Sequence, residues 1–525
     1  MMLKQLLNGC EMSERSPEQA SCADMDISGV AYDSRNVKNG DIFVAIRGEK
    51  NDGYHFIRDV LSKGAVAVVH ERRDDALGTG ERGKNSSICF IQVENSRKVL
   101  ACISNNFYRR PSEHLTLIGI TGTNGKTTSS YILKSILEAH GQITGLIGTI
   151  HYIIKEKLYP ALHTTPESPE FQSLLHTMLA SGCTVVVSEV SSHALAQYRV
   201  DGAVFHTAVF MNLTRDHLDF HKTMEEYYRA KQRLFIELLA RDGTAVINLD
   251  DQYGRRLASG LPSAGFRRCI TFGIASEADI TAHDINNTFD GLQFALLFGG
   301  KRYDVSSPLV GVTNVYNILA AAGAALSLGV PWEAILRGIE KAMTVPGRFE
   351  KVNAGQSFLC IIDYAHTEDA LERLILTARG LLSPPGGRKR GSSFPDVKQP
   401  FSRIITVFGC GGDRDRGKRP VMGAIATRLS DVVIITSDNP RSEDPAAIIR
   451  EIEEGAGKKN YFIAPGRKEA IKKAVDMADD GDIVLVAGKG HETYQEIRGV
   501  RHDFDDREVL KEMIQDRLRS TTRND

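Results

Sequence analysis

The stretch GITGTNGKTT, residues 119–128, has the composition of a loop that binds phosphate between a strand and a helix. Its spacing departs from the strict motif G-x-x-x-x-G-K-[ST], which needs a glycine where the chain has Ile120. Gly119 stands one place earlier. The apolar run LTLIGI (115–120) predicts a buried strand before the loop, and the periodicity of 127–140 predicts a helix after it. This order is the one a phosphate loop needs, so an ordinary glycine turn is a poor alternative.

Each part of this loop has a predicted role toward phosphate. Backbone N–H groups from Gly122 to Lys126, together with the first turn of the helix, would surround the anion. Lys126 would neutralise the charge of the β- and γ-phosphates, and the Thr127 hydroxyl would reach Mg²⁺. The predicted phosphate-binding residues are Gly122, Thr123, Asn124, Gly125, Lys126, Thr127 and Thr128.

The length and charge of the chain limit its class. At 525 residues it exceeds the size of about 250–300 residues at which one core stops growing, so we expect several domains. Lys and Arg total 65 and Asp and Glu total 66, which argues against a whole-protein role in binding nucleic acid or a membrane surface. No apolar stretch approaches ~18 residues. We therefore expect a cytoplasmic protein, acting as a monomer.

The cysteines show no framework spacing and no C-x-x-C pair. This pattern favours buried thiols in a reducing compartment. The eight cysteines are at positions 10, 22, 89, 102, 183, 269, 360 and 410.

Apolar runs that end in polar residues recur along the chain and predict an α/β fold with three domains. A turn at 345–348 separates a helical stretch from a new series of such runs. We therefore predict domains over 1–111, 112–346 and 347–525. Besides 115–120, the runs lie at 41–46, 65–70, 88–93, 184–193, 206–217, 244–251, 404–420, 432–441 and 482–492.

Polar residues at the ends of parallel strands are candidates for ligand binding, because open α/β sheets bind ligands at that edge. Glu189 and His217 are the best-placed candidate metal ligands, since each follows a strand expected to be parallel to that of the loop. His217 alone is equally well explained as a polar residue satisfied at a strand end. His217 and His221 have the i,i+4 spacing of a zinc pair, but H-L-D-F-H lacks the glutamate of H-E-x-x-H and no third soft ligand is evident. We therefore reject zinc.

The last region combines both signs of charge on three strand ends. Arg414 in GGDRDRGKRP could hold a carboxylate or phosphate, as could Arg416, Lys418 and Arg419, and Asp438, Asn439 and Arg441 follow in SDNPR. Glu492 in GKGHE adds a carboxylate. Arginines beside acceptors for an ammonium suit a zwitterion such as an amino acid. The alternative is a set of solvated loop charges. A dinucleotide fingerprint is excluded, because Arg414 stands where G-x-G-x-x-G needs glycine.

Seven motifs, taken in order, closely resemble the Mur ligases of peptidoglycan synthesis. With the D-S-R segment at Asp33, the match runs from about Asp33 to Glu492 in the family's order and so covers nearly the whole chain. The motifs are GxTGTNGKT, EVSSH, NLTRDHLDFH, DYAHT, GCGGDR, DNPR and GKGHE. The resemblance implies a central P-loop ATPase-type parallel sheet flanked by a small UDP-binding N-terminal α/β domain and a C-terminal, amino-acid-binding Rossmann-like domain.

The resemblance also implies an ATP-dependent ligation that forms an amide, with Mg²⁺. ATP would phosphorylate the free glutamyl carboxylate of UDP-N-acetylmuramoyl-L-alanyl-D-glutamate, and the amine of meso-2,6-diaminopimelate would attack the acyl phosphate. Phosphorylation is needed because a carboxylate is a poor electrophile with a poor leaving group. The expected partners are thus small molecules, with no nucleic acid and no membrane.

Residue roles follow from the same resemblance. Lys231 in YYRAKQRLF matches the lysine that this family carbamylates to N6-carboxylysine, although the sequence alone would make it a helix-surface lysine. Its CO₂ adduct is an anion that could bind Mg²⁺. The implied catalytic set is Lys126, Glu189, His217 and Lys231, and the implied metal ligands are Thr127, Glu189, His217 and Lys231.

Substrate-binding residues are implied in the same way. The rest of the ATP site would comprise Asn317, Arg348 and Asp363. The UDP-N-acetylmuramoyl-dipeptide would be bound by Ser34, Arg35, Thr164, Thr165, Ser191, Gln197 and Arg199. Diaminopimelate would be bound by Arg414, Asp438, Asn439, Arg441, Gly488 and Glu492. Arg441 could form a bidentate pair with the second carboxylate, which lysine lacks.

Two departures and several alternatives stand beside this interpretation. The family usually has proline after D-Y-A-H-T, where this chain has Glu368, and the basic segment 383–400 looks like an inserted, solvated loop.

The nearest alternative is the lysine-adding relative. A superfamily ligase that extends folate is not expected to carry D-N-P-R and G-K-G-H-E together. From other classes, a P-loop switch protein and a non-catalytic precursor-binding protein remain.

Overall fold

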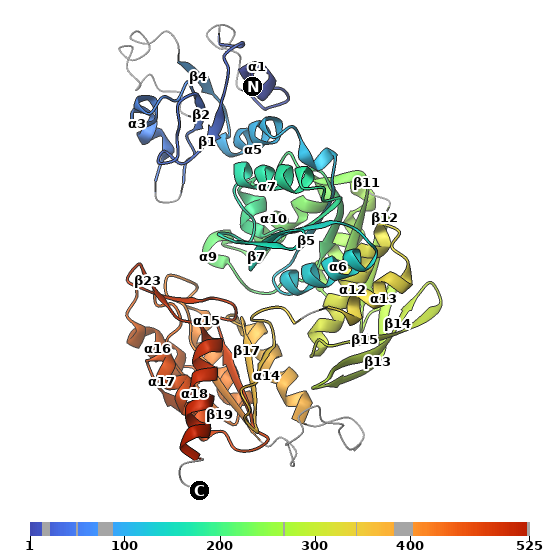
Figure 1. Ribbon diagram of the computed structural model, residues 1–525, viewed down its shortest axis with the longest axis vertical. Helices are drawn as coiled ribbons and strands as arrows, with labels where there is room; N and C mark the ends of the chain where they lie inside the picture. Colours follow the sequence, from blue (N-terminus) through green and yellow to red (C-terminus); the bar gives the residue numbers. More distant parts are fainter. Residues whose placement is uncertain are drawn as a thin grey trace.

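Three sheets, built largely from parallel strands, follow one another along the chain in this computed structural model (Figure 1). They confirm the predicted α/β class, and we name the N-terminal, central and C-terminal domains after them. The predicted boundaries after residues 111 and 346 fall between sheets and stay predictions. The basic segment 383–400 lies outside the described residues. The structure describes residues 1–12, 22–48, 51–71, 88–265, 268–342, 344–382 and 403–521.

The N-terminal domain is a four-stranded parallel sheet with helices beside it. Its middle strands, β2 and β3, are fully buried, which explains their continuous apolar sequence. In spatial order the strands are β1 (Gly29–Ala31), β2 (Asp41–Val44), β3 (Ala67–His70) and β4 (Cys89–Gln92). The helices are α1 (Leu3–Leu6), η1 (Gly53–Phe56), α3 (Ile57–Ser62) and α5 (Ser96–Phe107).

The cysteines differ from the prediction of eight buried thiols. Cys10 and Cys102 form a disulfide that ties the segment after α1 to α5. Cys269 is exposed and Cys22 is half-buried. The disulfide partners are 92 residues apart, and spacing alone contains no information about such a pair. The buried cysteines are Cys89, Cys183, Cys360 and Cys410.

The central sheet has eleven strands, and its parallel middle contains the phosphate-loop strand β5 between β10 and β9. Antiparallel strands extend it at both edges, β7 and β8 at one and β14 and β15 at the other, and the sequence interpretation missed these extensions. In spatial order the strands are β15 (Lys301–Ser307), β14 (Gly291–Phe298), β13 (Ile280–Thr288), β12 (Arg268–Gly273), β11 (Leu239–Asn248), β10 (Phe205–Phe210), β5 (Thr116–Thr121), β9 (Val185–Glu189), β6 (Thr144–Ile147), β7 (His151–Ile154) and β8 (Lys157–Pro160).

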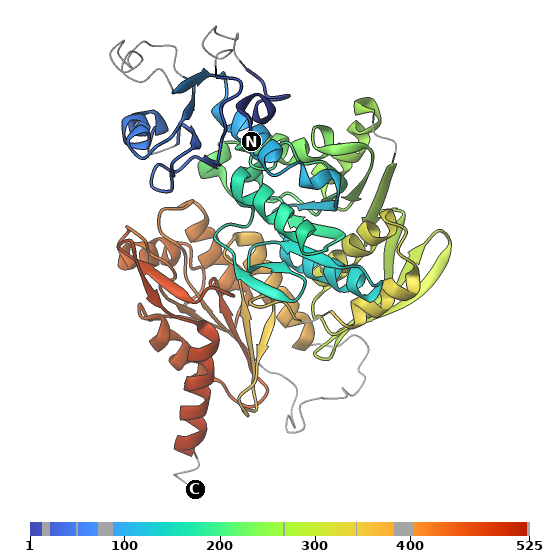
Figure 2. The same ribbon diagram turned by 45° about the horizontal axis from the view of Figure 1, so that its top comes forward.

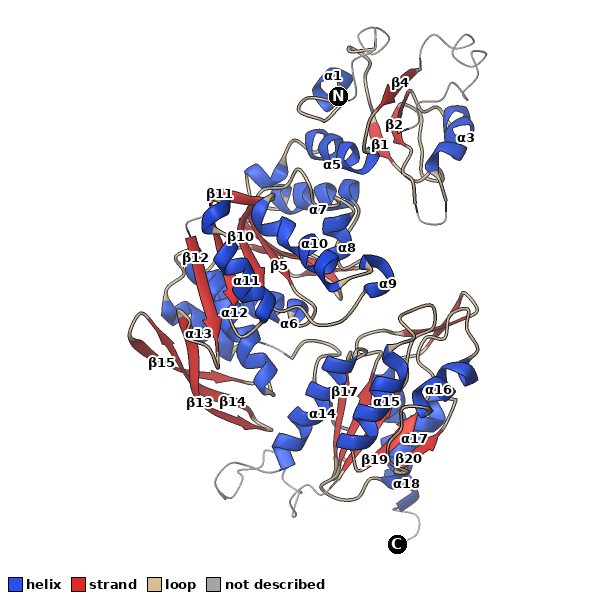
Figure 3. Cartoon of the chain, turned by 180° about the vertical axis from the view of Figure 1, so that it is seen from behind, coloured by secondary structure: helices blue, strands red, loops and turns tan. Residues whose placement is uncertain are grey.

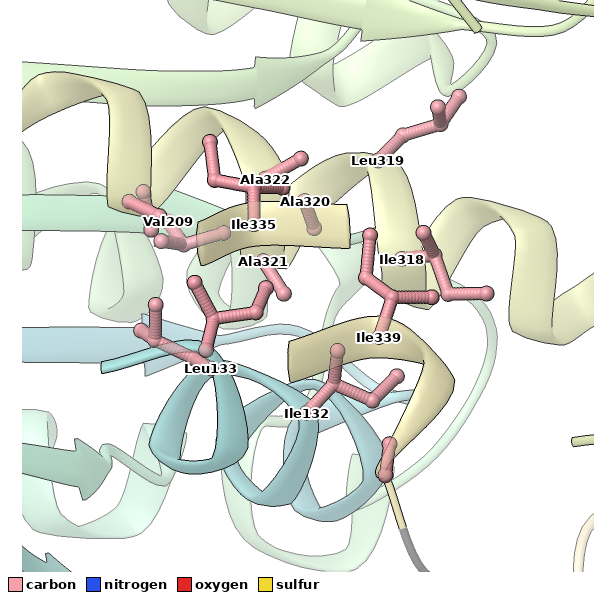
Figure 4. Close-up of a cluster of buried hydrophobic side chains, with 14 of the residues drawn as sticks. Ile132, Leu133, Val209, Ile318, Leu319, Ala320, Ala321, Ala322, Ile335 and Ile339 are labelled. Carbon is pink, nitrogen blue, oxygen red and sulfur yellow. The ribbon is translucent and has the colours of Figure 1, made fainter. Parts of the chain in front are cut away.

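Helices of the central domain cover its sheet, and three of them build its largest apolar core. Ile132 and Leu133 of α6 pack with Ile318 of α12 and with Ile335 and Ile339 of α13 (Figure 4). This core fixes α6, and therefore the loop before it, on the sheet. The helices are η2 (Pro111–Glu113), α6 (Lys126–Ala139), α7 (Ser168–Ala180), α8 (Ser192–Ala196), α9 (Leu218–His221), α10 (Met224–Ile236), α11 (Gln252–Gly260), η3 (Pro262–Ala264), α12 (Val312–Ser327) and α13 (Trp332–Glu340).

The displaced glycine of the phosphate loop has a packing role. Gly119 lies inside β5, where an added Cβ would be 2.8 Å from the Phe205 ring. The loop conformation instead uses Gly122, with φ of 153°, and Gly125, with φ of 89°, both in the region that favours glycine. Gly119 therefore lets β5 approach Phe205 and lies outside the loop.

The C-terminal domain is a six-stranded sheet with helices on its faces, as Figure 3 shows from behind. All its neighbouring strands are parallel except β16 and β17. In spatial order they are β16 (Glu350–Val352), β17 (Leu359–Asp363), β21 (Ile483–Ala487), β18 (Ile404–Phe408), β19 (Val432–Ile435) and β20 (Tyr461–Ile463), and a hairpin adds β22 (Tyr494–Ile497) and β23 (Val500–Asp503). The helices are α14 (Glu368–Leu382), α15 (Lys418–Leu429), α16 (Pro445–Glu453), α17 (Arg467–Met477) and α18 (Asp506–Thr521).

The two chain ends lie at opposite ends of the molecule, with the central domain between them (Figure 2). Within the described residues, no helix combines the length and the apolar character that crossing a bilayer requires.

Candidate active site

The phosphate loop leads into the N-terminus of α6, and Asn212 holds the loop by accepting from the Thr123 N–H at 3.0 Å and from the Asn124 N–H at 2.9 Å. The loop ends at Gly125, and α6 begins at Lys126, so the free N–H groups of the first helical turn face the loop. The Lys126 ammonium folds back and donates to the Gly122 carbonyl at 2.8 Å and the Thr123 carbonyl at 3.0 Å. Burial lowers the pKa of Lys126, and the nearby Glu189 carboxylate opposes this shift. The loop and its lysine therefore form a preorganised site for phosphate.

Glu189 is the last residue of β9, and its carboxylate is directed at the loop. It is fully buried and accepts from the Thr127 hydroxyl at 2.9 Å and from the N–H and hydroxyl of Thr149, each at 2.9 Å. Because β5 and β9 are parallel neighbours, Glu189 and the loop meet at the same sheet edge, as the sequence predicted.

Lys231 is buried, which corrects its interpretation as a helix-surface lysine. Its side chain is 1% exposed and donates to the Gly122 carbonyl at 2.9 Å, the same oxygen that accepts from Lys126. Burial and the Lys126 charge hold the pKa of Lys231 well below its ordinary value. The sequence interpretation missed a signal here, because Tyr227, Tyr228, Leu234 and Phe235 lie three or four residues from Lys231 and form the buried face of α10.

His217 follows β10 and lies near the loop, in the left-handed region with φ of 55°. Its Nε2 is 3.3 Å from an Asp216 carboxylate oxygen, and its ring centroid is 4.7 Å from that of His193. Burial lowers the pKa of His217, while Asp216 opposes the shift. His221 pairs instead with the Ser192 hydroxyl at 2.9 Å. The described part of the chain contains no cluster of three or more His, Cys, Asp or Glu side chains that could hold a metal.

A cavity of about 250 Å³ lies beside the phosphate loop, between the central and C-terminal domains. Asn317, Arg348 and Asp363, the three predicted ATP residues outside the loop, all line it. Asp363 accepts from the Phe349 N–H at 2.7 Å, and burial raises its pKa. Among the described residues, Arg348 Nε is buried without a hydrogen-bond partner, so the cavity retains an unused donor. The sequence interpretation missed three further lining residues, Asp250, Tyr316 and Arg373.

A second cavity, of about 210 Å³, lies across the same domain interface. The C-terminal domain contributes all six residues that the sequence predicted for diaminopimelate, namely Arg414, Asp438, Asn439, Arg441, Gly488 and Glu492. The central domain contributes residues that follow its parallel strands: His193 after β9, and Asp216, His217 and Asp219 after β10. A group bound here would therefore lie between His217 and the C-terminal domain.

Hydrogen bonds hold the acidic side of this second cavity in place. Asn439 donates from its amide to Glu492 at 2.7 Å, and Lys489 donates to both side chains at 3.2 and 3.3 Å. Burial and the Asp438 charge raise the pKa of Glu492. Gly488 is required here, because an added Cβ would lie 2.3 Å from an Asp438 carboxylate oxygen. Two carboxylates are thereby concentrated at one point, which suits an ammonium ligand.

Arginines form the other side of the cavity, and two of the four basic candidates in GGDRDRGKRP do not reach it. Arg441 donates to the Gly412 carbonyl at 2.7 Å and lines the cavity with Arg414 and Lys418. Arg416 is paired with Glu451, and the buried Arg419 is paired with Glu443 and Glu451. Their prediction as anion ligands was therefore wrong, since these ion pairs fix α15 and α16 instead. The sequence interpretation also missed Tyr364 and His366, although both stand in the D-Y-A-H-T motif.

The predicted dipeptide residues form one network near Glu189. Thr165 donates to the Glu189 carbonyl at 2.9 Å and lies 3.3 Å from the Ser191 hydroxyl. Arg199 donates to the Thr165 carbonyl at 3.1 Å and to Gln197 at 2.6 Å. Thr164 joins through the Thr149 hydroxyl.

Ser34 and Arg35 lie apart from this network, in the loop after β1 of the N-terminal domain. Arg35 is exposed and pairs with Asp33 at 2.6 Å, and the Ser34 carbonyl accepts from Lys63 at 2.8 Å. Tyr32 of the same loop donates to Glu170 of the central domain at 3.2 Å. The loop therefore faces the central domain, but the structure does not bring Ser34 and Arg35 into the two cavities.

The phosphate loop and the pocket of mixed charge lie at one domain interface, an arrangement that suits an enzyme binding a nucleotide and a second substrate together. The chain belongs to the Mur ligase family. Residues 26–108 match the Mur ligase family catalytic domain, residues 120–325 the Mur ligase middle domain, and residues 391–490 the Mur ligase glutamate ligase domain.

Individual relatives cover nearly the whole chain. The UDP-N-acetylmuramoyl-L-alanyl-D-glutamate–2,6-diaminopimelate ligase of Solibacter usitatus is 45% identical over 517 residues, 98% of each chain. A solved structure of a ligase with the same name is 33% identical, covers 99% of this chain and 100% of its own, and has a TM-score of 0.65. The MurF ligase of Thermotoga maritima, solved in complex with ADP, is 20% identical, covers 95% of this chain and 99% of its own, and shares the fold with a TM-score of 0.61.

Proposed function

We propose that this protein joins meso-2,6-diaminopimelate to the glutamyl carboxylate of UDP-N-acetylmuramoyl-L-alanyl-D-glutamate at the expense of ATP, in cytoplasmic synthesis of peptidoglycan precursors. The observation that carries the proposal is the second cavity, in which arginines and carboxylates face the phosphate site across one domain interface. Relatives named for this reaction, at 45% and 33% identity over nearly the full chain, support the same substrates.

ATP would bind with its phosphates in the loop and its base and ribose in the first cavity. Lys126 and the N–H groups of the loop offset the phosphate charge, and the unused Arg348 donor and the Asn317 amide face the remainder of the nucleotide. The glutamyl carboxylate attacks the γ-phosphorus, and the bond to the β-phosphate oxygen breaks. The products of this step are ADP and an acyl phosphate.

Lys231 fits the role of a carbamylated lysine. A buried amine with a strongly lowered pKa is neutral for much of the time, and a neutral amine is the form that attacks CO₂. The new N–C bond forms as the nitrogen loses a proton, which gives an anionic carbamate. The carbamate would then lie beside the Lys126 ammonium, and the two groups would attract each other. Two protonated amines at these positions would instead repel each other.

The donors around the loop also fit Mg²⁺. The Thr127 hydroxyl and a Glu189 oxygen are 2.9 Å apart, and hard oxygen donors of this kind suit Mg²⁺ better than Zn²⁺. Thr127, Glu189, His217 and carbamylated Lys231 would hold it. When bound, the ion neutralises charge on the phosphate oxygens.

Diaminopimelate would bind in the second cavity with its reacting amine toward His217 and the acyl phosphate. Asp438 and Glu492 suit the ammonium of its distal centre, and Arg414 and Arg441 suit the carboxylate there. The reacting amine, once deprotonated, attacks the acyl carbon, and phosphate leaves. Lysine has no distal carboxylate and could not form the charge-assisted pairs with the exposed Arg414 and the half-buried Arg441, which favours diaminopimelate.

The decisive experiment measures phosphate release from ATP with UDP-N-acetylmuramoyl-L-alanyl-D-glutamate, comparing meso-diaminopimelate with L-lysine. We expect release to require diaminopimelate. Arg441→Ala should raise the KM for diaminopimelate roughly 10- to 100-fold, since it removes charge-assisted hydrogen bonds. Arg416→Ala is the matched control, because this neighbouring arginine is paired with Glu451 outside the cavity and its loss should leave KM unchanged.

Other results would select an alternative. Equal or faster release with lysine would indicate the lysine-adding ligase. ATP binding without release that depends on either amine would favour a nucleotide-dependent switch or a precursor-binding protein.

A further inference from the structure

One arginine of the central domain reaches two carboxylates of the C-terminal domain. Arg215 lies in the loop between β10 and α9, and its Nη2 is 3.4 Å from an Asp415 oxygen. Its Nε is 4.0 Å from an oxygen of Glu368, the first residue of α14. We call these three residues the Arg215 clasp.

A second contact supports the idea that the start of α14 is a docking point. Asp369, the next residue, accepts from the Asn124 side-chain amide of the phosphate loop at 2.9 Å. Figures 1 and 3 both show α14 on the side of the C-terminal domain nearest the central domain, where it also packs against β13. Two consecutive carboxylates of one helix therefore contact two loops that carry site residues.

The clasp packs closely against the turn at Gly417. An added Cβ at Gly417 would be 3.0 Å from Arg215 Nη2 and 3.1 Å from an Asp415 oxygen. Asp415 is in turn fixed by accepting from the Gly417 N–H at 2.8 Å. Arg215 therefore lies directly over the turn that precedes α15.

The charges of the clasp depend on the arginine. Burial and the Asp415 charge raise the pKa of Glu368, while Arg215 opposes this shift. Lys418 also opposes the shift of Glu368. Without Arg215, the charges of Glu368, Asp415 and Asp216 would be offset less completely at this point of the domain interface.

We propose that Arg215 is a positioning residue that fastens the C-terminal domain to the central domain through Glu368 and Asp415. The clasp adjoins both walls of the second cavity: Arg215 precedes Asp216 and His217, and Asp415 follows Arg414. It therefore holds His217 opposite the pocket for the incoming amine. The catalytic consequence rests on the proposed function, whereas the fastening itself does not.

The test is a double-mutant cycle that compares the wild-type protein with Arg215→Ala, Glu368→Gln and the double variant. We expect Arg215→Ala to lower kcat/KM for diaminopimelate about fivefold, mainly through KM, because each pair is partly exposed. Added salt should lower the kcat/KM of the wild-type protein toward that of Arg215→Ala, because salt screens exposed ion pairs. The double variant should be no worse than Arg215→Ala, and Arg215→Lys should recover part of the loss.

Arg302→Ala is the matched control. Arg302 is 56% exposed, against 50% for Arg215, and also contacts two carboxylates, Asp284 and Asp304, but all three lie within the central domain. This variant removes the same charge and should leave kcat/KM unchanged. Equal effects of Arg215→Ala and Arg302→Ala, or strictly additive effects of Arg215→Ala and Glu368→Gln, would overturn the proposal.

Small-angle scattering separates failure of the clasp from failure of the proposed function. Arg215→Ala should increase the mean separation of the two domains in the protein without substrates, and Arg302→Ala should not. If the wild-type protein lacked turnover that depends on an amine, the proposed function would fail, and scattering would still decide the clasp. Unchanged scattering for Arg215→Ala would refute it.

Discussion

At the scale of single residues, the site depends on two lysines that share one acceptor. Lys126 and Lys231 both donate to the Gly122 carbonyl, which places two potential cations side by side in a buried setting. Such an arrangement is unfavourable unless one amine is neutral or carries a negative group. Carbamylation of Lys231 satisfies this requirement, because it converts the pair into one of opposite charge.

This argument predicts a carbamate that can be observed directly. In ¹³C-labelled bicarbonate, the wild-type protein should show a carbamate carbon resonance by NMR, and Lys231→Met should lose it together with phosphate release. Lys472→Met is the control, since this lysine is exposed and paired with Asp476, and it should retain the resonance. A resonance that survives in Lys231→Met would place the carbamate elsewhere.

At the scale of elements, close helix packing holds the phosphate loop. Gly338 of α13 lies against α6, where an added Cβ would be 2.3 Å from the Ile136 Cα, and the Ser135 hydroxyl donates to the Gly338 carbonyl at 2.7 Å. A backbone atom cannot move aside as a flexible side chain can. Gly338→Ala should therefore separate α13 from α6 and destabilise the central domain by about 1–3 kcal/mol.

Gly380 of α14 provides the matched control for this prediction. It is also a helical glycine, but it is exposed, and nothing lies within 4 Å of an added Cβ. Gly380→Ala should stabilise the protein by about 0.5–1 kcal/mol, because alanine restricts the unfolded chain more. Thermal unfolding of the two variants should shift the apparent midpoint in opposite directions. A higher midpoint for Gly338→Ala would contradict the packing argument.

The sequence predicted the helices, strands and strand-end residues better than it predicted which residues distant in the sequence contact each other. Apolar runs located the parallel strands, and the polar residues after them, such as Glu189 and Asp438, lie at the expected edge because parallel strands end together. The apolar periodicity of α10 contains the burial of Lys231, whereas the ion pairs of Arg419 depend on how separate segments pack. The Arg215 clasp depends on two domains, so no local pattern contains it.

At the scale of the whole molecule, the two cavities lie between domains and have buried ionisable groups beside them. Burial shifts the pKa of such groups, so the stability of the folded protein depends on pH. His491 stands beside Glu492 in the C-terminal domain, and within the described residues its Nδ1 is buried without a hydrogen-bond partner. Burial, together with the charges of Arg348, Arg507, His151 and Lys489, lowers its pKa to about 3. The folded protein thus keeps this imidazole neutral at pH values where the unfolded chain binds a proton.

The sign of the pH dependence follows from this difference. Between about pH 6.5, the ordinary value for histidine, and the lowered value, the unfolded state binds more protons, so stability falls as the pH falls. His491→Gln should remove about 1–2 kcal/mol of this loss between pH 7 and pH 5. Its apparent unfolding midpoint should therefore decline less than that of the wild-type protein over this range. His283→Gln is the control, because His283 of β13 is exposed, and this variant should decline as the wild type does. Equal declines for both variants would show that His491 is already protonated in the folded interface, and that the cavity beside Glu492 is wetter than its burial indicates.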